Sequence, residues 1–99
     1  MAIQLLPLAA GRVIGGTGVG TGIAGAASAR TGAGVYTLTM DQQIDSTQCA
    51  MIGMLEVNTG TIAMAHTSDS VKGVTTTAVD GTTATDKTFD FVIWQILGI

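Results

Sequence analysis

The side chains best suited to catalysis are few and widely spaced in this chain of 99 residues. The single histidine, His66, is far along the chain from the single cysteine, Cys49, and no acid stands at a spacing that would orient its imidazole. We therefore expect His66 to be structural or exposed to solvent, and Cys49 to be a small buried hydrophobe. The sequence predicts no enzyme and no catalytic, cofactor-binding or metal-binding residues.

The acidic residues do not form a recognisable site either. Glu56 and Asp90 fall within predicted strands, where they could face solvent or pair between subunits. Asp80-Gly81 lacks the alternating oxygen ligands of a calcium loop. Five aspartates fall in or beside predicted turns, where Asp forms hydrogen bonds with its own backbone. They are Asp41, Asp45, Asp69, Asp80 and Asp86.

A glycine motif matches the dinucleotide-binding fingerprint in form. Gly20-Thr-Gly22-Ile-Ala-Gly25 has the required spacing, and Asp41 lies near the position of the ribose-binding acid. The fingerprint also needs a following helix and a parallel sheet, and neither is predicted here. We therefore expect no nucleotide cofactor.

Composition excludes several further classes of protein. The net charge is −3 and the four cations are scattered, which argues against a nucleic-acid surface. The N-terminus has no basic region before an apolar run, so no cleaved signal peptide is expected. A lone cysteine suits a chain made in a reducing cytoplasm.

The elements that would carry any site begin after a glycine-rich segment, residues 3–28. Its glycine density disfavours a soluble helix. Three interpretations remain: an extended arm lying across another subunit, a weak transmembrane span, and a flexible tail. Arg12 and the shortage of large apolar residues weaken the membrane interpretation, so we expect no membrane span. The favoured division is an extended Gly/Ala-rich N-terminal arm, residues 1–29, followed by a folded domain, residues 30–99.

The folded domain is predicted to be all-β. In Arg30–Met40, Tyr36, Leu38 and Met40 alternate with Val35, Thr37 and Thr39, as in a half-buried strand. A second strand is predicted at 48–57, and because it is apolar on both faces we expect it to be buried on both sides. Further strands are predicted at 61–66, at 71–79 and at 89–96, and we expect the last of these at the centre of its sheet. Such spacing, with no helix, predicts a small antiparallel β-sandwich or open barrel. Few large side chains make the core thin, so association with copies of itself or with a larger partner is expected.

The string Arg30-Thr-Gly-Ala-Gly-Val-Tyr-Thr-Leu-Thr39 and the ending Phe89-Asp-Phe-Val-Ile-Trp-Gln-Ile96 resemble small β-sandwich modules of tailed-bacteriophage virions. Together with the arm, this resemblance is to a capsid decoration (cement) protein. It implies a virion structural protein, assembled in the host cytoplasm. It also implies that the major capsid protein is the partner and that the chain is a homo-oligomer, with a trimer favoured.

The alternative within the same resemblance is a head-fibre or tail-fibre receptor-binding module, which would recognise carbohydrate. Carbohydrate-binding proteins usually stack exposed aromatic side chains on sugars. Such side chains are scarce here, because Tyr36 and Trp94 are both expected to be buried in strands.

Overall fold

The computed structural model describes residues 3–42, 48–57, 59–78 and 81–98, and these form eight strands without a helix. The strands are β1 (Ile3–Val13), β2 (Gly20–Ala24), β3 (Ala26–Gly32), β4 (Val35–Met40), β5 (Cys49–Leu55), β6 (Thr61–His66), β7 (Val71–Thr77) and β8 (Phe89–Gly98). The all-β prediction is confirmed. Three positions that the sequence places in turns, Asp45, Asp80 and Asn58 of the Asn58-Thr59-Gly60 turn signal, lie outside the described residues. So does Val79, the end of the strand predicted at 71–79.

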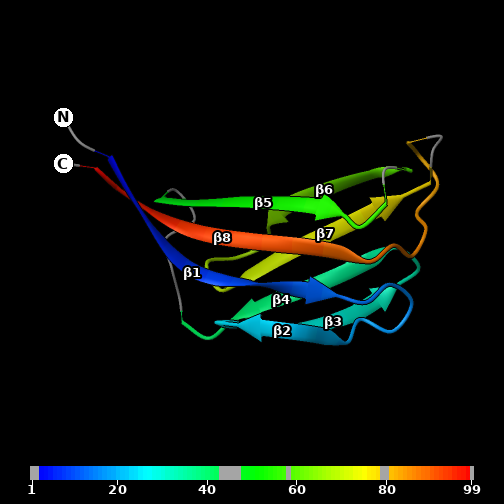
Figure 1. Ribbon diagram of the computed structural model, residues 1–99, viewed down its shortest axis with the longest axis horizontal. Helices are drawn as coiled ribbons and strands as arrows, with labels where there is room; N and C mark the ends of the chain where they lie inside the picture. The colour runs from blue at the N-terminus through cyan, green and yellow to red at the C-terminus, as the bar shows by residue number, and fades with distance from the viewer. Residues whose placement is uncertain (1–2, 43–47, 58, 79–80, 99) are drawn as a thin grey trace.

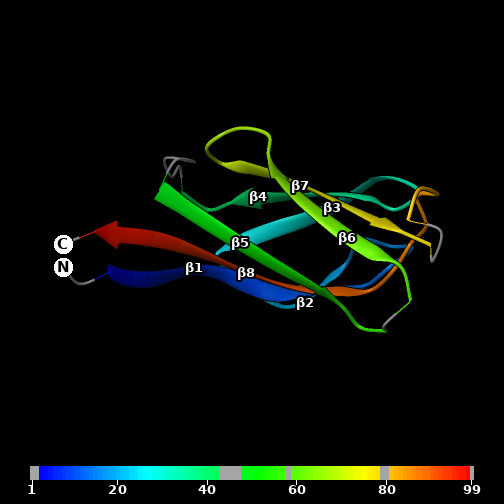
Figure 2. The same ribbon diagram turned by 90° about the horizontal axis from the view of Figure 1, so that it is seen from above.

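The strands form two four-stranded antiparallel sheets that do not close into a barrel. Sheet A has the order β2-β1-β8-β5, and sheet B has the order β3-β4-β7-β6. Figure 2 shows the two layers from above, with β1 and β8 in one and β4 and β7 in the other. The chain passes from sheet A to sheet B twice, between β2 and β3 and again between β5 and β6 (Figure 1). The structure is consistent with the predicted small β-sandwich.

The prediction of an extended arm, residues 1–29, is wrong for the residues that the structure describes. β1 lies inside sheet A, between β2 and β8, and β3 pairs with β4 in sheet B. The register of β1 with β8 runs from Ile3 opposite Gly98 to Val13 opposite Phe89, so the two ends of the chain lie side by side (Figure 1). Residues 3–29 are therefore part of the fold.

Some glycines of this segment occupy positions where close packing leaves no room for a side chain. A Cβ on Gly11 would lie 2.7 Å from the Ile23 Cα, so glycine lets β1 and β2 approach. Gly25 has φ +80° and forms the corner between β2 and β3. These glycines interrupt the alternation of apolar and polar residues by which a strand is recognised in a sequence, because glycine supplies no side chain to the pattern.

The core lies between the sheets and comes from one face of each. As predicted, β4 turns Tyr36, Leu38 and Met40 inward, and they are buried. β8 lies between β1 and β5, as predicted, and packs Phe89 edge-on against Tyr36, with ring centroids 5.3 Å apart. The buried apolar core is completed by Ala9, Val13, Cys49, Val74, Phe91 and Ile93. The contact between Tyr36 and Phe89 therefore joins the two segments that carry the resemblance, Arg30–Thr39 and Phe89–Ile96.

Candidate interaction surface

The outer face of sheet A is apolar over most of its length. Because neighbouring side chains on a strand point to opposite faces, the partners of the buried residues lie outside. The register aligns Pro7, Trp94 and Ala50 across three strands, then Ala10, Val92 and Ile52, with Leu5 opposite Ile96 at the end. Met54 is 66% exposed, Ile52 56% and Leu5 54%. We call these residues the outer face of sheet A.

Two sequence predictions need correction here. The strand at 48–57 was expected to be buried on both faces, yet Ile52 and Met54 of β5 are exposed. Both side chains lie on the outer face of sheet A, which no third layer covers in the described part of the chain. Trp94 was expected to be buried, but it is only half-buried, because it points outward while Ile93 and Phe91 point into the core.

Charged side chains close one end of this face. Arg12 binds the Asp90 carboxylate through two nitrogens, at 2.7 and 3.0 Å, and reaches Glu56 at 3.0 Å. The hydrogen bond with Asp90 raises the pKa of Arg12. The sequence left open whether Glu56 and Asp90 face solvent or pair between subunits. In the structure both acids pair with Arg12 of the same chain. All three side chains are about half exposed, so the pairs add little stability.

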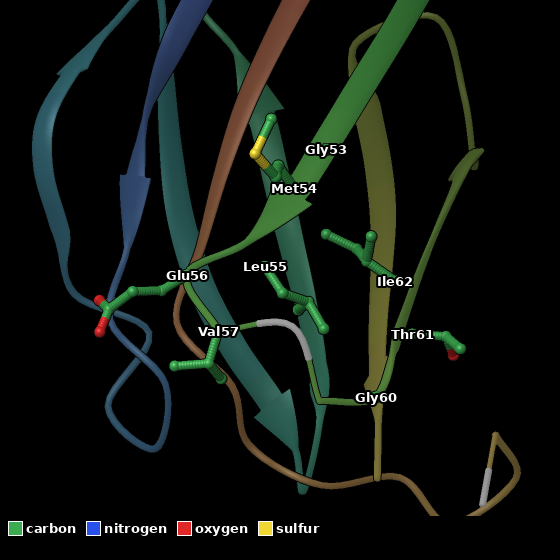
Figure 3. Close-up of a pocket in the computed structure, with 8 residues that line it drawn as sticks. All are labelled: Gly53, Met54, Leu55, Glu56, Val57, Gly60, Thr61 and Ile62. Carbon is green, nitrogen blue, oxygen red and sulfur yellow. The ribbon is translucent and has the colours of Figure 1, made fainter. Parts of the chain in front are cut away.

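A hollow of about 550 Å³ lies beside β5, where the chain passes to β6. Figure 3 shows Leu55 and Ile62 extending into the space between the two strands, while Met54 and Glu56 point away from it. Gly53 permits this approach, since a Cβ there would lie 2.8 Å from the Ile62 Cδ1 and 2.7 Å from the Met64 Sδ. The other lining residues are Val57, Gly60 and Thr61.

A polar network joins three loops at one end of the sandwich. The Asp86 carboxylate accepts hydrogen bonds from Arg30 at 2.9 and 3.0 Å, from the Gly34 N–H at 2.8 Å and from the Tyr36 hydroxyl at 2.7 Å. These donors, Arg30 first, hold the pKa of Asp86 well below its usual range. The Tyr36 oxygen in turn accepts a bond from the Gly16 N–H at 3.2 Å, and burial raises the pKa of Tyr36. Asp86 is thus more than a local turn residue.

The network is structural. Each of its members already has a partner inside the chain, and the described residues contain no buried side-chain nitrogen or oxygen without a hydrogen bond. Arg30 and Tyr36 both belong to the predicted stretch Arg30–Met40, but the sequence pattern did not predict Asp86 beside them. The contact spans about fifty residues, and no local pattern encodes it.

The remaining candidates lie apart. His66 is exposed at the end of β6, and Cys49 is buried, which raises the pKa of its thiol. Residues 20–25, the glycine motif, form β2 and the corner after it, with a strand where the fingerprint needs a helix. Within the described ranges, no three metal-ligating side chains come together.

One buried charge was not foreseen. Lys72 is completely buried on the inner face of β7, and its ammonium donates to the carbonyls of Ser68 at 2.9 Å and Asp69 at 2.8 Å. It ties the loop between β6 and β7 to the core. The alternation of residues along β7 could have predicted this, because Lys72 lies on the same face of the strand as the buried Val74 and Thr76.

Comparison with known proteins found no matching family model, no matching curated protein and no matching solved structure. Across the described parts of the chain, no helix has the length and apolar character to cross a membrane.

Proposed function

We propose that this chain is a non-enzymatic virion structural protein, a capsid decoration (cement) protein. In this proposal it binds the outer capsid surface of a tailed bacteriophage and stabilises contacts between major capsid subunits. The observation that carries the proposal is the outer face of sheet A. A contiguous apolar surface with a charged border is typical of a protein–protein contact.

The two outer faces differ in a way that suits attachment from one side. The outer face of sheet B has small and polar side chains and no charge among its described positions. These side chains are Ala27, Ala29, Val35, Thr37, Thr39, Thr61, Ala63, Ala65, Val71, Gly73, Thr75 and Thr77. In the proposed arrangement sheet A meets the capsid, and the threonine-rich sheet B faces solvent.

Size and chemistry support a role in binding rather than catalysis. The thin two-layer core gains stability from a partner that covers the apolar face, because binding the folded state alone stabilises it. The polar networks around Asp86 and Arg12 are satisfied within the chain. The resemblance of the Arg30–Thr39 and Phe89–Ile96 strings to phage β-sandwich modules points to a capsid as the partner.

The test is binding to capsids of the phage that encodes the chain, stripped of this protein, and measured by co-sedimentation. Ile52→Asp places a charge on the apolar face, at the middle of strand β5, and we expect at least about tenfold weaker binding. Thr37→Asp, on the outer face of sheet B, is the matched control and should bind like the wild type. Equal binding by both variants would exclude the outer face of sheet A as the attachment surface. Cryo-electron microscopy that finds the chain only on the tail would exclude a decoration protein.

A second candidate function is a receptor-binding module of a head or tail fibre. The observation in its favour is Trp94, which is half-buried on the outer face of sheet A beside Pro7 and Ala50. An aromatic ring on a flat face can stack on a sugar. Saturable binding on a glycan array that Trp94→Ala abolishes would favour this function over cement.

A further inference from the structure

We infer that β5 is the strand through which two copies of this chain pair, so that their A sheets join into one continuous sheet about a twofold axis. This inference goes beyond the proposed function, because it concerns the free edge of β5 and not the outer face of the sheet. It starts from hydrogen bonding: within the described residues, β5 has one neighbour, β8, on one side only.

The hydrogen-bond phase shows which backbone groups face the free edge. The Glu56 N–H donates to the Thr88 carbonyl at 2.9 Å, and the register from Cys49 to Leu55 against β8 is unbroken. In an antiparallel pair such bonds recur at every second residue. Residues 50, 52 and 54 therefore bond to β8, and the N–H and C=O groups of Met51, Gly53 and Leu55 point to the free edge.

This edge lacks the features that usually prevent strands from pairing between molecules. Natural edge strands are kept apart by short length, charged residues, proline or bulges. β5 has seven residues, none of them charged or proline, and its register contains no bulge. By contrast, β2 has five residues and an irregular register against β1, and β3 carries Arg30. β6 ends in a titratable residue, His66, and presents small outward side chains, Ala63 and Ala65, in place of Ile52 and Met54.

The occupant that fits this edge is a second copy of β5. When two such strands run antiparallel with Ile52 opposite Ile52, Met51 and Gly53 lie opposite each other and share edge-facing hydrogen bonds. In the same register each large apolar residue faces a smaller one, Met54 opposite Ala50 and Leu55 opposite Cys49. Glu56 then falls opposite Gln48, so no like charges meet.

Pairing at this edge would give a sheet of β2-β1-β8-β5 from each copy, with the two outer apolar faces side by side. The attachment surface of the proposed function would double in area. The dimer is nevertheless tested without any capsid, so its failure is distinct from failure of the proposed function.

The first measurement is the molar mass of the purified chain by sedimentation equilibrium over a wide concentration range. We expect a reversible monomer–dimer equilibrium. Ile52→Lys puts two like charges opposite each other at the twofold axis and should shift the chain to monomer. Val35→Lys is the matched control, an exposed β-branched residue on the outer face of sheet B, and it should leave the equilibrium unchanged. A wild-type chain that stays monomeric at every concentration would overturn the inference.

Cysteine cross-linking fixes the register. Ile52 forms a non-hydrogen-bonded pair with its counterpart, with Cα atoms about 4.5 Å apart, a distance that suits a disulfide. Met54 is more exposed, but four residues of offset would place it about 13 Å from its counterpart. Under mild oxidation Ile52→Cys should therefore form a dimer and Met54→Cys should not, both in a Cys49→Ser background checked for a native circular-dichroism spectrum and repeated with Cys49 present. Equal cross-linking of the two variants would overturn β5 pairing.

Discussion

At the scale of single residues, Asp86 shows how a carboxylate with a strongly depressed pKa can be structural. Four donors, from Arg30, the Gly34 backbone and Tyr36, converge on its two oxygens. Depressed pKa values often mark functional sites. Here every donor already belongs to the chain, and the side chain is largely covered. The network ties together the loops that precede β4 and β8.

The Asp86 network makes a prediction about acid stability. The folded state keeps this carboxylate ionised at pH values where the unfolded chain, with an Asp pKa of about 3.9, is protonated. The unfolded chain then binds more protons, so the stabilisation is complete above about pH 4 and is lost as the pH falls below it. We expect Asp86→Asn to lower the melting temperature at neutral pH and to converge with the wild type in acid.

Thermal melts from neutral to strongly acidic pH measure this effect. Tyr36→Phe is the control, since it keeps the ring contact with Phe89 and removes only the hydroxyl. It should cost about 1–3 kcal/mol, because the Gly16 N–H and Asp86 each lose a partner. Its curve should keep most of the acid dependence. Wild-type and Asp86→Asn curves that stay parallel down to the lowest pH would contradict the role of Asp86.

At the scale of elements, the corner between β2 and β3 decides whether the N-terminal strands can belong to both sheets. Gly25 lies where the chain leaves sheet A, with φ +80°, and a Cβ built there would lie 3.1 Å from the Ala9 Cα of β1. A side chain there would overlap the carbonyl oxygen of Leu8. The position therefore needs glycine for two reasons, the backbone conformation and the space.

Gly25→Ala and Gly22→Ala separate these two reasons. Gly22 also has positive φ, +64°, but a Cβ there meets nothing within 4 Å. Gly22→Ala should cost about 1–2 kcal/mol from backbone strain alone. Gly25→Ala should cost clearly more, because the Leu8 carbonyl must also move. Urea unfolding followed by circular dichroism measures both, and equal losses would show that the corner tolerates a side chain.

At the scale of the whole molecule, the two sheets are one folding unit because the N-terminal strands contribute to both. Without residues 1–29, sheet A would keep β8 and β5, and sheet B would keep β4, β7 and β6 with a remnant of β3. Val13 and Ala9 would leave the core, and Phe89 and Phe91 would lose the strand that pairs with β8 on that side. An isolated pair of strands is marginal in water.

We therefore expect a chain lacking residues 1–29 to be unfolded. If these residues were an arm, the rest would fold without them. A two-dimensional ¹H–¹⁵N NMR spectrum of the truncated chain distinguishes the two cases, because an unfolded chain gives narrow amide proton dispersion. Adding the peptide 1–29 back provides the control, since recovery of dispersed signals would show that the missing strands are the cause. Dispersed signals from the truncated chain alone would contradict this account.

Local pattern in the sequence was enough for the fold class and for the inner face of β4. Alternation of Tyr36, Leu38 and Met40 with polar partners follows directly from the twofold repeat of a strand. The central place of β8 was also predictable, because it holds both phenylalanines and the tryptophan. The absence of a triad or a Cys/His cluster was likewise read from residue types and remains a prediction about activity.

Tertiary structure decided what the glycines and the long-range partners do. A glycine that permits close packing and one that loosens a tail look alike in sequence, so residues 3–29 were mistaken for an arm. Whether Trp94 and Ile52 are buried depends on the layers that cover their strand, which alternation within the strand does not specify. Asp86 meets Arg30 and Tyr36 only because two distant loops close the same end of the sandwich. Such contacts arise from the topology of the sheets, which local sequence pattern does not encode.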